Sequence, residues 1–302
     1  MSVELGRLLT AMITPFKADG ALDLDAAERL AAQLVADGSD GVVVSGTTGE
    51  SPTLDDDEKI ELLRAVRQAI PGKTVVAGTG SNDTHHSVKL SERAMKAGAD
   101  ALLAVVPYYN KPPQDGMYLH FKAISEAGPT IMYNIQGRTA VNMTAATTLR
   151  CAELPGIVGV KEASGDLDQV GFVCAGKPAH FTVWSGDDSW TLPVLAAGGY
   201  GVICVVSHLA GGSMKRLIEA YGKGDNQTAR EIHLGLLPVI KTLMTTAANP
   251  VPIKSVLNAM GFPAGPFRLP LVPLSADQLQ SVMKTVHDAG ELITFKPGVK
   301  VA

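Results

Sequence analysis

The sequence is short of several residue types, and each shortage excludes a class of protein. Only three of its 302 residues are cysteines, Cys151, Cys174 and Cys204, and no two have the spacing of metal ligands. An odd number of widely separated cysteines is typical of reduced thiols in a cytosol rather than of a disulfide framework. We therefore expect a cytoplasmic protein whose cysteines are small buried apolar residues.

Positive charge is never concentrated, and long hydrophobic runs are missing. The net charge is −4, and no Lys/Arg-rich run occurs, which disfavours nucleic acid and anionic membranes as main partners. No apolar run reaches the roughly 18 residues of a membrane helix. The N-terminal stretch MSVELGRLLTAMITPF has an acid at position 4 and no basic segment, so it does not resemble a signal peptide. We expect no nucleic acid or membrane partner.

What the sequence has is a recurring short apolar run. With 46% hydrophobic residues, the chain can bury a large core. The runs are continuous rather than alternating, which is typical of strands that are covered on both faces. They are TAMIT (10–14), GVVVSG (41–46), KTVVAG (73–78), ALLAVV (101–106), TIMYN (130–134), IVGVK (157–161), FTVWSG (181–186) and GVICVV (201–206).

Helical patterns fill the gaps between these runs. In the first gap, Asp23 is a suitable N-cap and Gly38 a suitable stop, and a later helix is expected from about His85 to Ala97. Strict alternation of strand and helix predicts a parallel α/β sheet. An open Rossmann sheet should carry G-x-G-x-x-G after its first strand, but that turn reads ITPFKADG. We therefore predict an eight-stranded parallel TIM barrel over residues 1–206.

Beyond residue 206 the strand pattern stops. Segments 211–223, 226–246, 251–260 and 275–288 have helical patterns, interrupted by NPVP (249–252) and PAGPFRLPLVP (263–273). We expect a C-terminal helical region over residues 207–302. The last ten residues, ITFKPGVKVA, suggest no role.

Lys161 stands at the end of an apolar run, where a charge is costly. A buried ammonium group usually pairs, reaches water or loses its proton, and a neutral lysine amine is a nucleophile. Taken alone, Lys161 is also explained as the buried ion-pair partner of Glu162, Asp187 or Asp188. In a barrel, however, the ends of all strands meet at one rim, where active sites form.

The other strand ends supply hydroxyls, phenols and one guanidinium. Each has an ordinary interpretation, because GTTGES (46–51) forms a turn, the tyrosines of PYYNKP (107–112) can pack, and the arginine of YNIQGRT (133–139) can lie on the surface. Their convergence on one rim favours chemistry. No zinc-type histidine–carboxylate cluster, G-x-S-x-G elbow or Gly-rich phosphate loop occurs there. An amine among hydroxyls suits carbonyl chemistry through an imine.

These motifs together resemble a known family. The ordered set GTTGES, PYYNKP, YN…GRT, GVKEASG, SGDD, NPVPIK and RLPLVPL is similar to the dihydrodipicolinate synthase family, within the pyruvate-dependent lyases that include N-acetylneuraminate lyase. The resemblance spans residues 8 to 290. It implies a lyase that condenses pyruvate with L-aspartate semialdehyde to 4-hydroxy-tetrahydrodipicolinate, for lysine and diaminopimelate biosynthesis. It implies no cofactor beyond the covalent Schiff base.

The resemblance also implies catalytic roles. Lys161 would form the Schiff base with pyruvate, and Tyr133 would donate and accept the protons above it. Thr47 and Tyr109 would complete a hydroxyl relay. Members are mostly homotetramers in which the tyrosine that matches Tyr109 reaches into a neighbouring subunit's site.

Three further residues would bind substrates. Thr48 would hold the pyruvate carboxylate, with the backbone of Ile203 nearby, and Arg138 would receive the carboxylate of aspartate semialdehyde. The main alternative is an aldolase acting on 2-keto-3-deoxy sugar acids or N-acetylneuraminate, and the other is a non-catalytic barrel. Arg138 favours the synthase, because the sugar-acid lyases lack an arginine in this stretch.

The sequence departs from the family in two places. Gln136 stands where members usually have proline, which predicts a looser loop around Arg138. Lysine-inhibited members have histidines at the positions of Asp56 and Lys59 and an acid at the position of His86, whereas Asn82 and Tyr108 are retained. We therefore expect weak or absent feedback by lysine.

Overall fold

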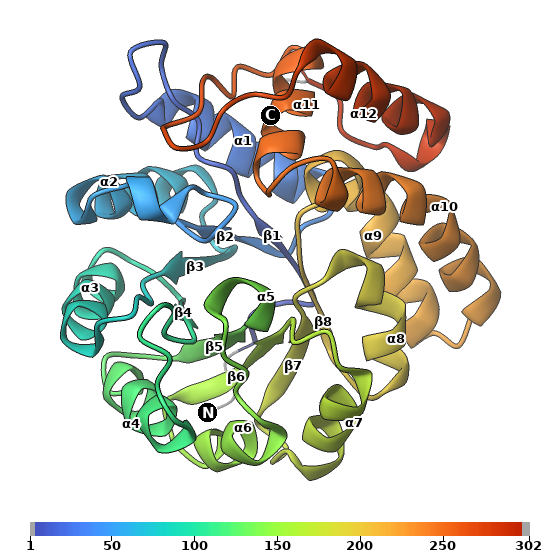
Figure 1. The fold of residues 1–302 in the computed structure, drawn as a ribbon. Coiled ribbons are helices and arrows are strands. Elements are labelled where there is room, and N and C mark those ends of the chain that lie inside the picture. The colour runs from blue at the N-terminus through green and yellow to red at the C-terminus, as the bar shows by residue number, and fades with distance from the viewer. Residues whose placement is uncertain (1–3, 298–302) are drawn as a thin grey trace.

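Eight short parallel strands close into a barrel in chain order (Figure 1). β8 pairs with β1, with Leu8 opposite Val202, and this pairing completes the ring. The predicted closed barrel is therefore confirmed over the residues that the computed structural model describes, 4–297. The strands are β1 (Leu8–Ala11), β2 (Gly41–Val44), β3 (Thr74–Gly78), β4 (Ala101–Val105), β5 (Thr130–Asn134), β6 (Ile157–Glu162), β7 (Thr182–Ser185) and β8 (Gly201–Cys204).

Helices surround the barrel and extend it on one side. The acids and hydroxyls that precede several helices accept backbone hydrogen bonds; Asp23 caps the first helix as expected. The helices are α1 (Leu24–Ala36), α2 (Asp56–Ala69), α3 (Thr84–Lys96), α4 (Gln114–Ser125), α5 (Gln136–Thr139), α6 (Ala145–Ala152), α7 (Leu167–Gly176), α8 (Thr191–Ala196), α9 (Ser207–Gly222), α10 (Asn226–Thr245), α11 (Val251–Ala259), α12 (Ala276–Asp288) and the short 3₁₀ turns η1 (Ser51–Thr53), η2 (Asp188–Trp190) and η3 (Gly290–Leu292).

Successive strand residues point alternately into the barrel and toward the helices, so the strands are buried on both faces. This accounts for the continuous apolar runs. The outward residues join the large core under the helices. The inward residues form a separate cluster: Leu5, Leu9, Ala11, Val43, Val76, Ala101, Leu103, Ile131, Tyr133, Trp184 and Ile203.

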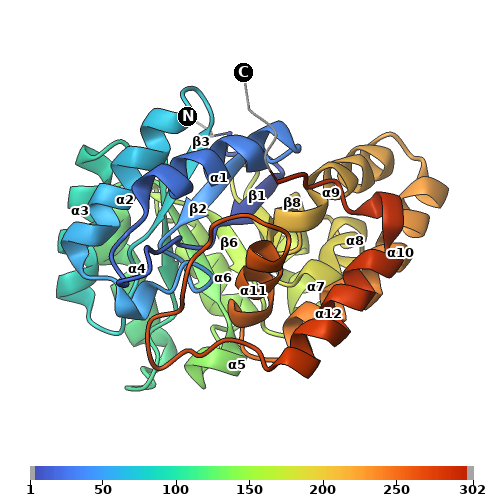
Figure 2. The same ribbon diagram turned by 90° about the horizontal axis from the view of Figure 1, so that it is seen from above.

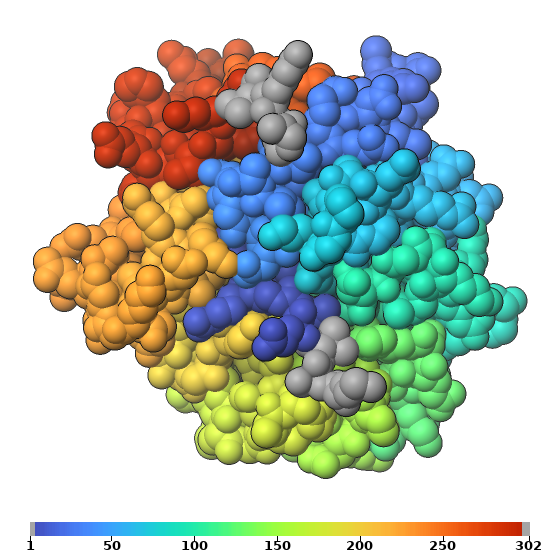
Figure 3. Space-filling model, turned by 180° about the vertical axis from the view of Figure 1, so that it is seen from behind, coloured from blue at the N-terminus to red at the C-terminus, as the bar shows by residue number. Residues whose placement is uncertain are grey.

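The N-terminal segment covers the amino end of the barrel. Leu5 is buried in the interior cluster, and the indole Nε1 of Trp184 donates to the carbonyl of Gly6 at 3.0 Å. Figure 3 shows this dark blue segment in the middle of the back face. A cavity that reaches the strand interior must therefore open at the other end, where the strands lead into the helices.

Several predicted boundaries were displaced. The first strand is Leu8–Ala11 rather than residues 10–14, because LLTAMIT is apolar throughout and hydrophobicity alone marks no end. The third helix runs one residue earlier than expected. The helix after β8 begins at Ser207, not at residue 211, because one extra turn precedes a break at Ala210 (φ −133°).

The C-terminal region consists of α10, α11 and α12, which lie beside α1 and α9 (Figures 1 and 2). α9 itself packs against β1, α1 and α8, as a helix of the barrel ring does. The expected division between 1–206 and 207–302 stays a prediction, and its ends, residues 1–3 and 298–302, lie outside the described residues. Within residues 4–297, no helix combines the length and apolarity that crossing a bilayer requires.

Candidate active site

Lys161 ends the inward face of β6 and is buried. Only 5% of the residue is exposed, and its Nζ lies 4.3 Å from the centre of the Tyr133 ring on the adjacent strand. The β5–β6 register places these two residues directly opposite each other. Burial lowers the pKa of the Lys161 ammonium to about 8, whereas the nearby carboxylate of Asp188 acts to raise it. At pH 7 roughly a tenth of the Lys161 amine is therefore neutral, and this neutral fraction is nucleophilic.

Tyr133 supplies a phenol that keeps its proton. Burial raises the pKa of its hydroxyl to about 12, while the charge of Arg138 and a hydrogen bond with the Thr47 side chain act in the opposite direction. The hydroxyl is thus a proton donor at neutral pH that is already connected to a second hydroxyl. Lys161, Tyr133 and Thr47 form one continuous group, which is what the sequence predicted of their positions.

Thr47 and Thr48 lie in a tight turn after β2. The Gly46 carbonyl accepts from the N–H groups of Gly49 (3.0 Å) and Ser51 (3.2 Å), which folds the chain back on itself. Thr47 faces a cavity, whereas Thr48 is 2% exposed and its Oγ1 accepts from Asn249 Nδ2 at 2.9 Å. The Thr48 hydroxyl is therefore fixed by a residue from the C-terminal region.

Arg138 lies on α5, the short helix across the barrel mouth in Figure 1. Its guanidinium is exposed, and Nη2 donates to the carbonyl of Asn249 at 3.1 Å. Arg138 lines a cavity of about 360 Å³ together with Thr47 and Tyr133, and it also lines a second cavity of about 490 Å³ that includes Asp187. A cation at the junction of two cavities is suited to bind a carboxylate that enters either one.

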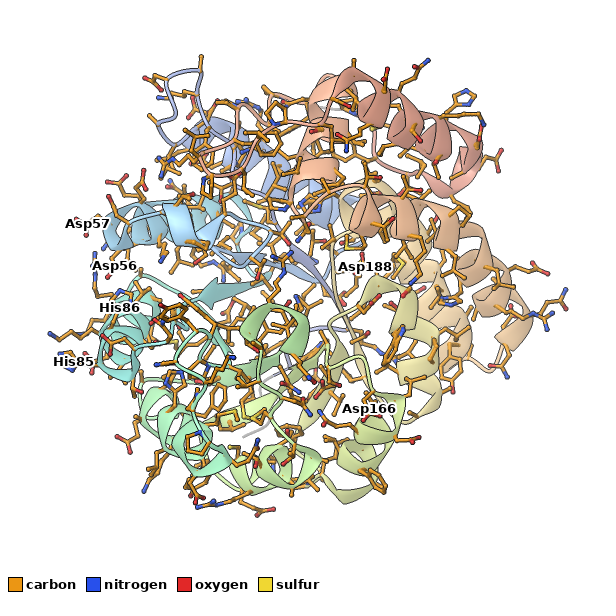
Figure 4. The ribbon with its side chains drawn as sticks, in the orientation of Figure 1. Asp56, Asp57, His85, His86, Asp166 and Asp188 are labelled. Atoms are coloured by element: carbon orange, nitrogen blue, oxygen red, sulfur yellow. The ribbon has the colours of Figure 1, made fainter. Side chains whose placement is uncertain are left out.

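Residues of α2 and α3 also line the first cavity. Lys59, His86 and Tyr108 contribute to its wall. His86 Nε2 lies 2.9 Å from an oxygen of the Asp56 carboxylate, and Lys59 Nζ lies 4.0 Å from the other oxygen. Figure 4 shows Asp56 and His86 facing each other between the two helices. The only carboxylate among these groups is thus already paired with His86.

The structure leaves one predicted residue, Tyr109, outside this group, whereas Ile203 lies in the same interior cluster as Tyr133. Tyr109 is 89% exposed, has a positive φ of 70°, and is absent from the wall of the cavity, to which its neighbour Tyr108 contributes. Ile203 is fully buried in the barrel interior, in the cluster that contains Tyr133. Within a single chain, the Tyr109 hydroxyl is therefore available to a neighbouring molecule rather than to this chain's own Tyr133.

The sequence predicted no catalytic or substrate-binding role for two residues at the site. Asn249 contacts both Thr48 and Arg138, and the only signal for it was its place in the NPVPIK motif. Asp188 was considered only as an ion-pair partner of Lys161. It is buried, on the barrel side of α8 in Figure 4, and its carboxylate accepts from the N–H groups of Val205 (3.0 Å) and Val206 (2.6 Å).

The burial of Asp188 raises its pKa to about 6, and the two backbone hydrogen bonds act against that rise. Asp188 is therefore mostly ionised at neutral pH, and it places a buried negative charge near Lys161. No group of three or more His, Cys, Asp and Glu side chains within residues 4–297 is arranged to hold a metal ion. The chemistry that this arrangement supports is addition of the Lys161 amine to a carbonyl, with proton transfer by Tyr133.

Comparison with known proteins identifies the family. A model of the Dihydrodipicolinate synthetase family matches residues 4–289. The 4-hydroxy-tetrahydrodipicolinate synthase of Moorella thermoacetica is 53% identical over 293 residues, which cover 96% of this chain and 100% of that protein.

Solved structures give the same result. Dihydrodipicolinate synthase from Cyanidioschyzon merolae with lysine bound has a TM-score of 0.92 and 44% identity, covering 95% of this chain and 98% of that one. The chloride-inhibited enzyme from Acinetobacter baumannii complexed with pyruvate has a TM-score of 0.90 and 34% identity, covering 95% and 99%. The resemblance seen in the motifs is confirmed, and the chain belongs to the dihydrodipicolinate synthetase family.

Proposed function

We propose that this protein condenses pyruvate with L-aspartate semialdehyde through a Schiff base at Lys161, giving 4-hydroxy-tetrahydrodipicolinate for lysine and diaminopimelate biosynthesis. The observation that carries the proposal is the buried Lys161 amine, with a pKa of about 8, 4.3 Å from the Tyr133 ring in a chain of this family. Relatives whose sequences are 53% and 50% identical to this chain are named 4-hydroxy-tetrahydrodipicolinate synthase.

In the first half of the reaction, the neutral Lys161 amine attacks the keto carbon of pyruvate. Tyr133 and Thr47 transfer the protons that allow water to leave, and an iminium ion results. Thr48 would bind the pyruvate carboxylate through its backbone N–H and its hydroxyl. Loss of a methyl proton then gives an enamine, because the iminium accepts the electron pair. The imine itself serves as the electron sink, so the step calls for no metal or cofactor.

In the second half, the enamine carbon attacks the aldehyde carbon of aspartate semialdehyde. Arg138 would bind that substrate's carboxylate through its planar guanidinium. The substrate's own amine then attacks the iminium carbon, which closes the ring and releases Lys161. A sugar-acid aldolase would share the imine but would have no carboxylate for Arg138 to receive at this place.

Reduction with borohydride tests the proposal directly. With pyruvate present, we expect one pyruvate-derived mass on the peptide that contains Lys161. Lys254 is the internal control, because burial also lowers its pKa to about 8 although it lies outside the predicted site. Labelling of Lys254 instead, or a Lys161→Ala variant with near wild-type activity, would refute the mechanism. Parallel assays with aspartate semialdehyde and with a sugar aldehyde distinguish the synthase from an aldolase.

The assembly and the regulation are part of the same proposal. We infer a homotetramer in which Tyr109 serves a neighbouring subunit, supported by its 89% exposure and its absence from the wall of the cavity that Thr47 and Tyr133 line. We also infer weak lysine feedback, since Lys59 and the paired His86 would meet a ligand's ammonium group. A cytosolic location is supported by the cysteines, which are all free thiols.

A further inference from the structure

A buried ion pair lies behind the turn that carries Thr47 and Thr48. Lys254 Nζ on α11 is 2.7 Å from Oε1 of Glu50, and both side chains are completely inaccessible to solvent. The same Nζ donates to the Thr14 carbonyl at 2.9 Å and lies 4.2 Å from the centre of the Phe16 ring. Neither charged group reaches the cavity, so the pair does not contact a substrate.

Glu50 is the residue that closes this turn. Its N–H donates to the carbonyl of Thr47 at 3.2 Å, and its backbone is held in the left-handed region, φ 55°, which is costly for a residue with a Cβ. Such a conformation persists only where neighbouring contacts hold it. The salt bridge from Lys254 is one of those contacts, and because it is excluded from water, removal of either partner would leave a buried group without its partner.

The contacts of Lys254 reach the turn by a second route. Thr14 accepts from Lys254 through its carbonyl and donates through its hydroxyl to the carbonyl of Gly49, at 2.7 Å. The other carboxylate oxygen of Glu50 accepts from the backbone N–H of Arg268, at 3.2 Å. The turn is therefore fixed from two directions by the C-terminal region, whose helix α11 lies between α1 and α12 in both ribbon views (Figures 1 and 2).

We propose that Lys254 is a positioning residue for the reaction, acting through Glu50 to hold the Gly46–Ser51 turn so that Thr47 reaches Tyr133 and Thr48 meets the pyruvate carboxylate. The expected effect on kcat/KM rests on the proposed function, whereas the expected effect on the conformation of the turn does not. Displacement of a positioned group by about 1 Å lowers rates by roughly 100-fold. The C-terminal region would then be part of the catalytic apparatus rather than an appendage.

The test uses the full-length protein and two changes of the pair. Glu50→Asp keeps both charges but shortens the reach of the carboxylate, and the double variant Glu50→Gln/Lys254→Met removes both charges together. Lys215→Met is a control for the loss of a paired lysine away from the turn, because Lys215 forms a partly exposed ion pair with Asp40 at 2.5 Å, at the opposite, amino end of β2. Each protein is examined by kinetics at varied pyruvate and by hydrogen exchange of the peptide covering residues 41–54.

We expect both changes of the pair to lower kcat/KM for pyruvate roughly 10- to 100-fold, per folded enzyme, and to speed exchange in residues 46–51. Lys215→Met should lower the melting temperature and leave both readouts within about twofold. If Glu50→Asp and the double variant fold but keep both readouts within about twofold, the pair only stabilises the fold and the inference is wrong. Absence of condensation in the wild-type protein would refute the proposed function, while hydrogen exchange would still decide whether the pair holds the turn.

Discussion

At the scale of single residues, Lys161 is a group that the fold keeps in an unfavourable place. Its folded pKa of about 8 lies below the ordinary 10.5, so below pH 8 the folded protein holds a buried ammonium at full cost. Between pH 8 and 10.5 the unfolded chain binds more protons than the folded one, and stability rises with pH. Removing the charge should therefore stabilise the protein most at low pH.

We predict that Lys161→Met abolishes activity and raises the free energy of unfolding at pH 7, by at most about 3 kcal/mol for a shift of this size. The gain should shrink toward zero as the pH approaches 10.5, and urea unfolding at pH 7 and 10 measures it. Lys89→Met, at an exposed position, should change stability by no more than about 0.5 kcal/mol at either pH. An equal effect of Lys161→Met at both pH values would contradict the role of the buried charge.

Sequence alone predicted that Lys161 and Tyr133 lie close together. Each stands at the end of a recognisable strand, and a barrel brings the ends of its strands together. The sequence did not predict the contact of Asn249 with Thr48, since their side chains are joined across 201 positions. Nor did it predict the left-handed Glu50, because nothing in the letters GTTGES marks that backbone as strained. Contacts that only the closed fold creates leave no local pattern.

At the scale of elements, the barrel's strands were predictable and their ends were not. Continuous apolar runs locate β2 to β8 but cannot say where pairing stops, as the displaced β1 shows. The short α5 was not predicted at all, because four residues are too few for a periodic pattern. Yet α5 positions Arg138, so the least predictable element carries a residue proposed for substrate choice.

The first position of α5 is suited to the proline that the family usually has there. Gln136 is exposed, and Ile135 before it (φ −144°, ψ 78°) is outside the helical region that a following proline disfavours. We predict that Gln136→Pro stabilises the protein by about 0.4–1 kcal/mol and does not raise the KM for aspartate semialdehyde. Thermal melts and kinetics check this, with Gln136→Ala as a control expected to be neutral. A lower melting temperature would show that the folded backbone at position 136 is incompatible with proline.

The pairing of α2 with α3 determines the expected response to lysine. With Asp56 occupied by His86 and with Lys59 in the cavity wall, we predict half-maximal inhibition only above about 1 mM lysine. Lys59→His/His86→Glu should strengthen inhibition by removing one positive charge and adding an acid. His85→Glu adds the same acid to α3 without lining the cavity and should not. Sub-millimolar inhibition of the wild-type protein would contradict this prediction.

At the scale of the whole molecule, one chain does not bring together all the members of the proposed relay. Lys161, Tyr133 and Thr47 meet within the chain, but the Tyr109 side chain points into solvent. A symmetric dimer contact would give each site the tyrosine of its neighbour, because the same surface is used on both subunits. The fold of one chain therefore accounts for the lowered pKa of Lys161, whereas completion of the proposed relay would depend on assembly.

Hybrid assemblies test whether Tyr109 acts between subunits. Tyr109→Phe should lower activity roughly 10²–10⁴-fold as loss of a general acid, and Lys161→Ala should be inactive. When the two variants are co-expressed with different tags, a Tyr109→Phe subunit receives an intact tyrosine from its Lys161→Ala neighbour. Random pairing should then restore about a quarter of the sites. Tyr108→Phe is the control, because Tyr108 lines its own chain's cavity, and any loss it causes should persist in hybrids. Hybrids of Tyr109→Phe that remain inactive would show that each chain uses its own Tyr109 or none.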